Sequence, residues 1–287
     1  MRTVTYAIFQ VLLPVFAAVN LAPAQERQPD NSFWNKKTLS LIGVSSVSAV
    51  TLIDSYYMWW KDDRRPFTFL TPAPGQGWLN EPHSLGIDKI GHFYTSLFLY
   101  HTKKNILTWG GYDRETASWI SLGLTSGLAL LIEIGDGFTR YGFDYQDLVF
   151  NIGGAGYGML QDRYTILESF IVKWSYVPTD AFTFPPHFTD HYDGHIYWLA
   201  FDINNLADIE GNIFPSFLLP AIGFSVADKG TRREYIIGLD IRLDGIFPKG
   251  DANWGLLRTT LGMIHLPAPG MKSANGKHPE YRLFLLN

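Results

Sequence analysis

Long apolar runs with few charges dominate the first two thirds of the chain. Residues 38–60 form one such run, in which Asp54 is the only acidic or basic residue, and an aromatic cluster at 56–60 ends it as at a membrane interface. The run is long enough to cross a bilayer. Its serines also allow the alternative of a buried helix in a bundle that lies on the membrane.

Three further helices are predicted from periodicity. The first starts near Asp88 and reaches about Tyr100, with Asp88, His92 and Ser96 on one face. The second starts near Arg114 and contains 116–132, an uncharged stretch at the lower limit for a span. The third covers 144–161, where small residues at 153–158 allow another backbone to approach closely.

The texture changes after Phe182, where alternation replaces long apolar runs. Strands are predicted near 196–201, 217–226, 237–243 and 281–286, and a short helix near 254–264. The fold class is therefore predicted to be α+β, a membrane-associated helical bundle followed by a small antiparallel β-rich region. The predicted organisation is a signal peptide (1–24), a linker (25–37), the bundle (38–172) and the β-rich region (173–287).

Composition supports a protein of the cell envelope. Hydrophobic residues make up 46% of the chain and charged residues only 17%, below the share usual for soluble domains. Arg2, the apolar stretch that follows and Ala22-Pro23-Ala24 are typical of a cleaved export signal, with an uncleaved anchor as the alternative. The chain has no cysteine, so no lipid-accepting Cys is present. We expect an exported, periplasm-facing protein of a Gram-negative envelope, in either membrane.

Several partner and cofactor classes are disfavoured. The net charge of -4 and the absence of basic runs argue against nucleic acid. The glycine-rich stretch 153–158 lacks the Lys-Ser/Thr of a phosphate loop, which argues against a nucleotide. No cofactor is expected; the expected partners are membrane lipid and an envelope protein.

Ionisable side chains embedded in the apolar part of the chain are the candidate site, because their burial is costly without a reason. The candidates are Asp88, His92, Glu133, Asp136, Asp147 and Asn151. They could converge as an acid–base or metal site between facing helices. Alternatively, Asp88 and Asp144 cap helices, Lys89 pairs with Glu133 or Asp136, and His92 and Asn151 form structural hydrogen bonds. A weaker metal candidate is the set His191, Asp193 and His195.

The same residues carry a family resemblance. Asp88-Lys89-x-x-His92-Phe93, Glu133-x-x-Asp136 and Asp144-x-x-Asp147-Leu-x-x-Asn151-x-x-Gly154-Ala155 resemble the YfiM-like family of uncharacterised envelope proteins, and more distantly the VanZ-like membrane proteins. The resemblance covers about 78–163 and extends to similar stretches at 173–176 and 192–199. It implies an envelope location but no activity. Several members are predicted lipoproteins, a mode of anchoring that this cysteine-free chain does not share.

Two functions follow as expectations. The favoured one is a structural or binding protein of the envelope that holds lipid or a protein partner through a helical bundle with a polar centre. The alternative is a hydrolase or transferase that acts on a lipid-linked envelope substrate.

Overall fold

The computed structural model describes residues 34–177, 192–207, 215–275 and 277–285. The predicted signal peptide and most of the predicted linker lie outside the described residues. The chain divides into two compact units, each assembled from separated segments. Unit 1 contains 1–71, 96–159 and 247–259, and unit 2 contains 72–95, 160–246 and 260–287.

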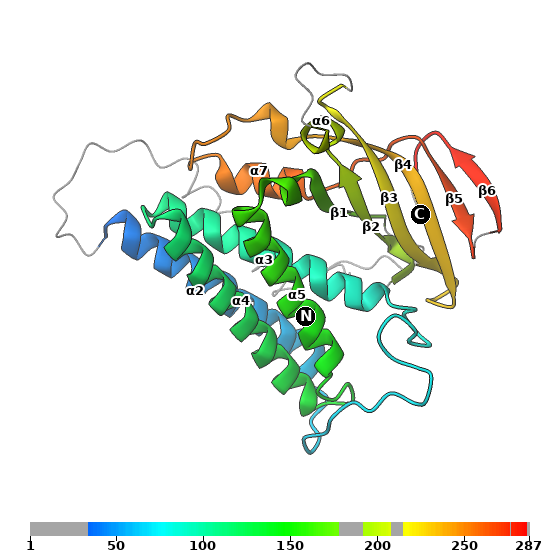
Figure 1. Cartoon of the computed structure of the whole chain (residues 1–287). Helices are drawn as coiled ribbons and strands as arrows, with labels where there is room; N and C mark the ends of the chain where they lie inside the picture. The colour runs from blue at the N-terminus through cyan, green and yellow to red at the C-terminus, as the bar shows by residue number, and fades with distance from the viewer. Residues whose placement is uncertain (1–33, 178–191, 208–214, 276, 286–287) are drawn as a thin grey trace. The chain divides into compact units, whose positions relative to one another are not determined.

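Four long helices follow one another along the chain (Figure 1). They are α2 (Lys36–Ser55), which continues into a π-helical turn (Tyr56–Trp60), α3 (Ile87–Trp109), α4 (Arg114–Gly137) and α5 (Tyr145–Arg163). The Asn35 side chain caps α2 by accepting from the Thr38 N–H at 2.9 Å, and Asp113 caps α4 in the same way through Thr116. Both caps satisfy N–H groups that the first helical turn leaves without backbone partners.

Helix α3 is longer than predicted. It continues to Trp109 because no helix-breaking residue follows Tyr100 until Gly110 and Gly111. Gly111 adopts a positive φ of 88°, a conformation that glycine takes without strain and that ends the helix.

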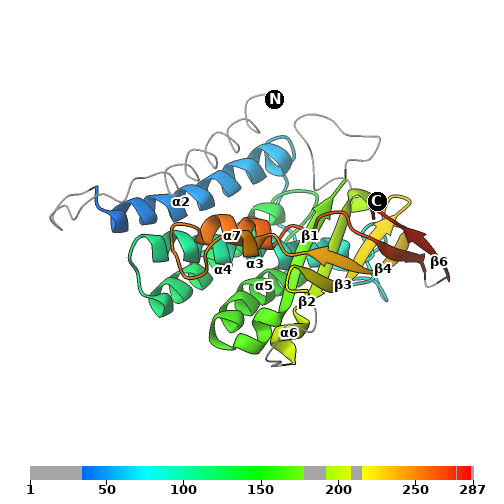
Figure 2. The same ribbon diagram turned by 90° about the horizontal axis from the view of Figure 1, so that it is seen from above.

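In unit 1, α2 and α4 lie side by side in both views (Figure 1, Figure 2). Val44 and Val47 of α2 form a buried cluster with Ile106, Leu107 and Ala117. A second buried cluster joins Tyr100, Ala155 and Met159. Small residues make these helices fit together, as the spacing of glycine and alanine in the sequence predicts.

Unit 2 is built on a six-stranded antiparallel sheet whose strands are ordered as in the sequence (Figure 1). The strands are β1 (Phe170–Tyr176), β2 (His195–Phe201), β3 (Leu218–Ala227), β4 (Arg232–Ile241), β5 (Gly270–Ala274) and β6 (Lys277–Arg282). The short helices α6 (Ile203–Leu206) and α7 (Gly255–Gly262) occur among the connections. The predicted α+β class is confirmed.

Two strands, β1 and β5, were not among the predicted ones, and β6 starts at Lys277, before the predicted 281. Alternation is weak in β1 because apolar residues occupy both faces and Lys173 interrupts them. The single buried position of β1 is Lys173, which pairs with Asp240 of β4 at 2.5 Å. The core on this buried face contains Ile196, Trp198, Leu219, Ala221 and Ile236.

Candidate functional site

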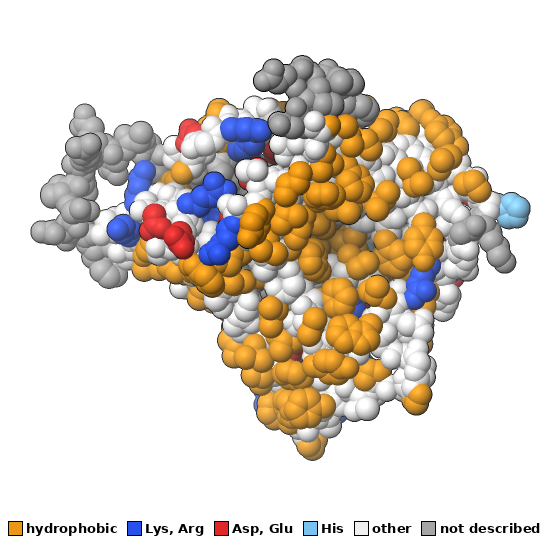
Figure 3. Space-filling view, in the orientation of Figure 1, with side chains coloured by type: hydrophobic (Ala, Val, Ile, Leu, Met, Phe, Trp, Pro, Cys, Tyr) orange, Lys and Arg blue, Asp and Glu red, His pale blue; other side chains and the backbone are white. Residues whose placement is uncertain are grey.

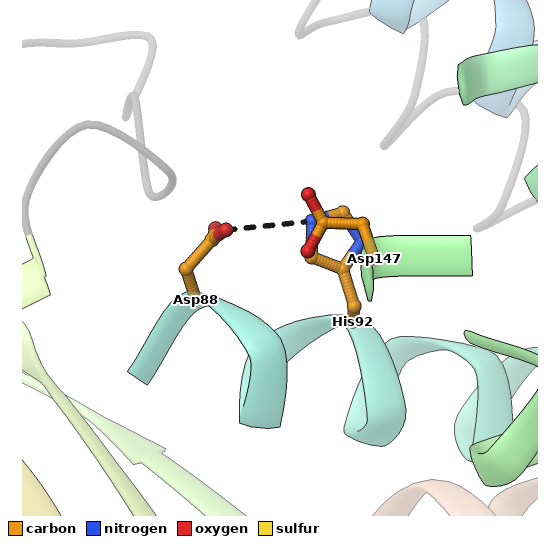
Figure 4. Close-up of side chains that lie close together, drawn as sticks. All are labelled: Asp88, His92 and Asp147. Carbon is orange, nitrogen blue, oxygen red and sulfur yellow. Dashed lines mark ion pairs between the residues drawn. The ribbon is translucent and has the colours of Figure 1, made fainter. Parts of the chain in front are cut away.

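The first turns of α3 present the Asp88-Lys89-x-x-His92 motif. A tight turn at Gly86, with a φ of 91°, leads into the helix, and a Cβ at this position would meet Leu79 at 2.7 Å. Asp88 therefore lies inside the first turn and not at the cap position considered above. His92 follows one turn later on the same face, and its Nε2 lies 3.8 Å from Asp88 Oδ2 (Figure 4).

Asp88 is held by groups from two segments of unit 2. The Tyr192 hydroxyl donates to Asp88 Oδ1 at 3.0 Å, and Lys89 Nζ lies 3.7 Å from Oδ2. Burial raises the pKa of Asp88, but the charges of His92 and Lys89 and the Tyr192 hydrogen bond outweigh it and hold that pKa below its usual value. Asp88 is thus ionised at neutral pH. Tyr192 was not among the candidates, although it opens the stretch 192–199 that carries the family resemblance.

Lys89 forms its shortest ion pair with Glu81, a residue that the sequence pattern did not single out. Lys89 Nζ lies 2.6 Å from Glu81 Oε1, and both side chains are almost fully buried. The Ser84 hydroxyl donates to the other carboxylate oxygen at 2.6 Å. Glu81 lies in a loop rich in proline and glycine, so no periodicity indicates that its side chain is buried.

Aromatic side chains of unit 2 surround this part of α3. The Tyr94 hydroxyl donates to the Met263 carbonyl at 3.0 Å, and its ring lies beside those of Trp174 and Tyr197. A Cβ at Gly91 would lie 2.9 Å from the Tyr197 hydroxyl, so the close approach needs glycine. Burial raises the pKa values of Tyr94 and Tyr197, which keeps both phenols neutral.

The remaining candidates lie in unit 1, where the described contacts are structural hydrogen bonds. Trp60 Nε1 donates to Asp136 Oδ1 at 2.7 Å, and Glu133 Oε2 accepts from the Asp144 N–H at 3.3 Å. The Ser96 hydroxyl donates to Asn151 Oδ1 at 2.7 Å, as the shared polar face of the helices predicts. Asp147 is buried in the first turn of α5.

Asp144 caps α5, since its Oδ1 accepts from the Gln146 N–H at 2.8 Å. Elsewhere in unit 1, the Lys103 side chain is buried and lies 3.3 Å from the Thr125 hydroxyl. Burial lowers the pKa of Lys103 to about 8. Polar side chains therefore occupy the interior of this helical unit.

The weaker metal candidates have other contacts in the described part of unit 2. Asp193 accepts from the Lys229 and Gly230 N–H groups, which fixes the turn between β3 and β4. His195 Nδ1 accepts from Trp174 Nε1 at 2.9 Å. His191 lies outside the described residues, so the three-residue metal site stays a prediction.

The chemistry open to the α3 motif follows from its accessibility. Asp88 and His92 are each about one quarter exposed, at 24% and 26%. A carboxylate beside an imidazole is a suitable acid–base pair, and the two side chains also offer two of the ligands that a zinc ion takes.

Residues 75–163 match a family described as a predicted periplasmic lipoprotein (DUF2279). The match covers nearly the same stretch as the motifs above and includes all six candidate residues. Its description supports an exported, envelope-associated protein; the lipoprotein part lacks an acceptor, because this sequence has no cysteine. No curated protein and no solved structure matches the chain. The YfiM-like and VanZ-like resemblance stays a resemblance.

Proposed function

We propose that this protein is a non-enzymatic membrane protein of the cell envelope that contacts bilayer lipid through the outer faces of its helical unit. The observation that carries the proposal is an inverted distribution of side chains. The long helices of unit 1 bury small and polar residues and expose large apolar ones.

Helix α4 shows the inversion most clearly. Its buried positions are almost all small or polar: Ala117, Ser118, Ser121, Thr125, Leu128, Ala129, Glu133 and Gly137. Its exposed positions include Trp119 and Leu131, which are 53% and 52% exposed. A helix of a water-soluble protein has the opposite arrangement, because burial of large apolar side chains drives its packing.

Helices α2 and α5 follow the same rule. In α2, Ser40 and Gly43 are buried while Leu41, Ile42 and Ile53 are exposed. In α5, the buried residues include Asp147, Asn151, Gly154 and Gly158, and the exposed ones include Val149 and Ile152. Figure 3 shows hydrophobic side chains over much of the visible surface of the helices, with charged side chains gathered near the start of α2.

Two of these helices have the dimensions of membrane spans. Residues 36–60 and 114–137 form helices of 25 and 24 residues, and only 28% and 39% of their most apolar windows are buried. At about 1.5 Å per residue each helix exceeds the roughly 30 Å of a hydrocarbon core. The low burial distinguishes them from core helices of a soluble protein, and the buried polar groups act as contacts between helices in lipid.

Extraction tests the proposal directly. We expect the full chain, expressed in a Gram-negative host, to stay in the membrane fraction after washes with high salt and alkaline carbonate, and to dissolve in detergent. Release by either wash would contradict the proposal, because it would show a peripheral or soluble protein.

A second candidate is an enzyme that acts on a lipid-linked envelope substrate. It is favoured by the partly exposed Asp88–His92 pair, with Asp88 ionised and oriented by Tyr192. The test is metal content and thermal stability of the detergent-purified protein, beside His92→Ala and, as a matched control, the exposed His278→Ala.

The outcomes separate the two candidates. Stoichiometric metal that His92→Ala loses with the fold intact would favour the enzyme. Absence of metal together with strong destabilisation by His92→Ala alone would favour the structural role.

A further inference from the structure

The sheet of unit 2 has a large apolar face that the described residues leave exposed. Paired residues from five strands form one continuous row across it: Leu199, Ile222, Ile237, Met271 and Tyr281. Ile237 is 62% exposed and Tyr281 68% exposed. Tyr235, in the next row, is also exposed. We call the exposed residues Ile222, Tyr235, Ile237, Met271 and Tyr281 the apolar sheet face.

Charged and small side chains are placed on the opposite side of the same strands. Successive residues of a strand point to opposite faces, so Lys272 and Glu280 point away from their neighbours Met271 and Tyr281. Lys272 forms an ion pair with Glu234, and Lys173 forms one with Asp240, all on that other side. The sheet therefore buries its ion pairs and exposes its aliphatic residues.

The apolar sheet face has few groups that could bind a folded protein specifically. In β3 and β4, Arg233 is the one charged residue that shares this face, and its guanidinium donates to the Leu79 and Leu85 carbonyls. Protein–protein interfaces carry about one hydrogen bond per 100–200 Å². On the apolar sheet face only the two tyrosine hydroxyls offer polar side-chain groups.

We propose that the apolar sheet face is a second lipid-contacting surface, which rests against the acyl-chain boundary of a bilayer. The proposal rests on the function proposed above and extends it to unit 2. The same inversion seen in the helices, buried polar groups and exposed large apolar ones, occurs independently in a β-sheet. A face with apolar side chains and tyrosines, backed by charged residues, is suited to the interface between headgroups and acyl chains.

The strands favour a position on the bilayer and not across it. β5 and β6 contain 5 and 6 residues, whereas a spanning strand needs about 9–11. Among the described strands β1 and β6 end the sheet, so each leaves one backbone edge without a neighbouring strand. Hydrocarbon cannot satisfy such edges, but water and headgroups can.

The absence of cysteine makes a site-specific test straightforward, since each introduced thiol is the only one in the chain. Ile237→Cys probes the apolar sheet face and Met271→Cys repeats it from β5. Glu280→Cys is the matched control, because it is exposed on the opposite side of the sheet. Leu131→Cys reports on α4, and thus on the proposed function itself.

Each full-length variant is labelled with an environment-sensitive fluorophore and reconstituted into phosphatidylethanolamine–phosphatidylglycerol vesicles. Circular dichroism and thermal unfolding confirm the fold. We expect quenchers attached to the acyl chains to reduce the signal at 237 and 271 severalfold more than at 280. Aqueous iodide should show the reverse order.

Two results would overturn the inference. One is equal quenching by iodide at 237 and 280, which would place the sheet in water. The other is protection of position 237 from both quenchers, together with a disulfide-linked dimer of the unlabelled Ile237→Cys variant on oxidation, which would assign the face to a second copy. In either case, acyl-chain quenching at 131 would leave the proposed function intact, and its absence would contradict that function as well.

Discussion

Lys173 and Asp240 form an ion pair with side chains that are inaccessible to solvent, at a separation of 2.5 Å. Removing two charges from water is costly, and an ion pair recovers that cost only while both partners are present. Burial raises the pKa of Asp240 even with Lys173 beside it. The pair is therefore sensitive to the loss of either residue.

Lys173→Met is expected to lower the free energy of unfolding by about 3–5 kcal/mol, because it leaves a buried carboxylate without its cation. The double variant Lys173→Met, Asp240→Leu should recover most of this loss, since no charge is then buried. Chemical denaturation of the detergent-purified protein at pH 8 measures both. A double variant no more stable than the single one would show that Lys173 acts through its packing and not through its charge.

His265 gives the same cluster a dependence on pH. Its ring stacks on Trp198 at 3.8 Å between centroids, its Nε2 lies 3.8 Å from Asp240 Oδ1, and Lys173 is the other charged group of the cluster. Burial lowers the pKa of His265 to about 4. Below the unfolded value of about 6.5, the unfolded chain takes up a proton that the folded chain does not.

Stability should therefore fall as pH drops from 6.5 towards 4, by roughly 3 kcal/mol from this residue. Asp240 has the opposite effect, since its raised pKa favours the folded state on acidification. Comparison of His265→Phe with the unsubstituted protein isolates the histidine. We expect the variant to lose less stability over this interval in denaturation at stepped pH; parallel curves would contradict the assignment.

At the scale of elements, close packing depends on particular glycines. A Cβ at Gly158 of α5 would lie 2.5 Å from the buried ring of Tyr100, whereas a Cβ at Gly156 would meet no atom within 4 Å. Gly158→Ala should destabilise unit 1 by about 1–3 kcal/mol through overpacking. Gly156→Ala, two residues away, should be neutral or stabilising by up to about 1 kcal/mol, because alanine favours a helix.

Thermal unfolding of the two variants, in the same detergent, provides the comparison. Equal shifts in the midpoint would indicate that the helices adjust freely and that the small residues at 153–158 do not determine the helix contact.

The helices and the later strands could be predicted from sequence because their apolar spacing is local. Residues 36–60 and 114–137 extend the predicted runs by a few residues at each end. The strand β1 could not be predicted in this way, because its period is obscured by apolar residues on both faces. Inverted burial was equally hidden: hydropathy locates an apolar helix but does not say which side chains face outwards.

The candidate site was predictable only in part, for a related reason. The spacing of Asp88 and His92 by four residues predicts their shared face, and the structure places them 3.8 Å apart. Tyr192 and Glu81 complete the surroundings of the motif from a distant segment and from an irregular loop. Their roles depend on tertiary contacts, which a single sequence does not specify.

At the scale of the whole molecule, the solvent around the exposed apolar residues decides how a new charge is tolerated. Leu131 of α4 and Ile246 of unit 2 are both large, exposed and aliphatic, at 52% and 71% exposure. In a protein surrounded by water, a change to arginine at either site would alter stability by no more than about 0.5 kcal/mol. In a bilayer the two sites differ, because only Leu131 lies within a helix long and apolar enough to span it.

Leu131→Arg is therefore expected to reduce the amount of protein in washed membranes strongly, since an arginine near the centre of a bilayer costs about 2.5–3.5 kcal/mol. Ile246→Arg should leave that amount unchanged. Immunoblots of the membrane fraction, normalised to total synthesis, measure both variants under the same promoter. Full tolerance of Leu131→Arg would mean that α4 faces water, in which case the exposed apolar faces of unit 1 would have to be covered by protein and not by lipid.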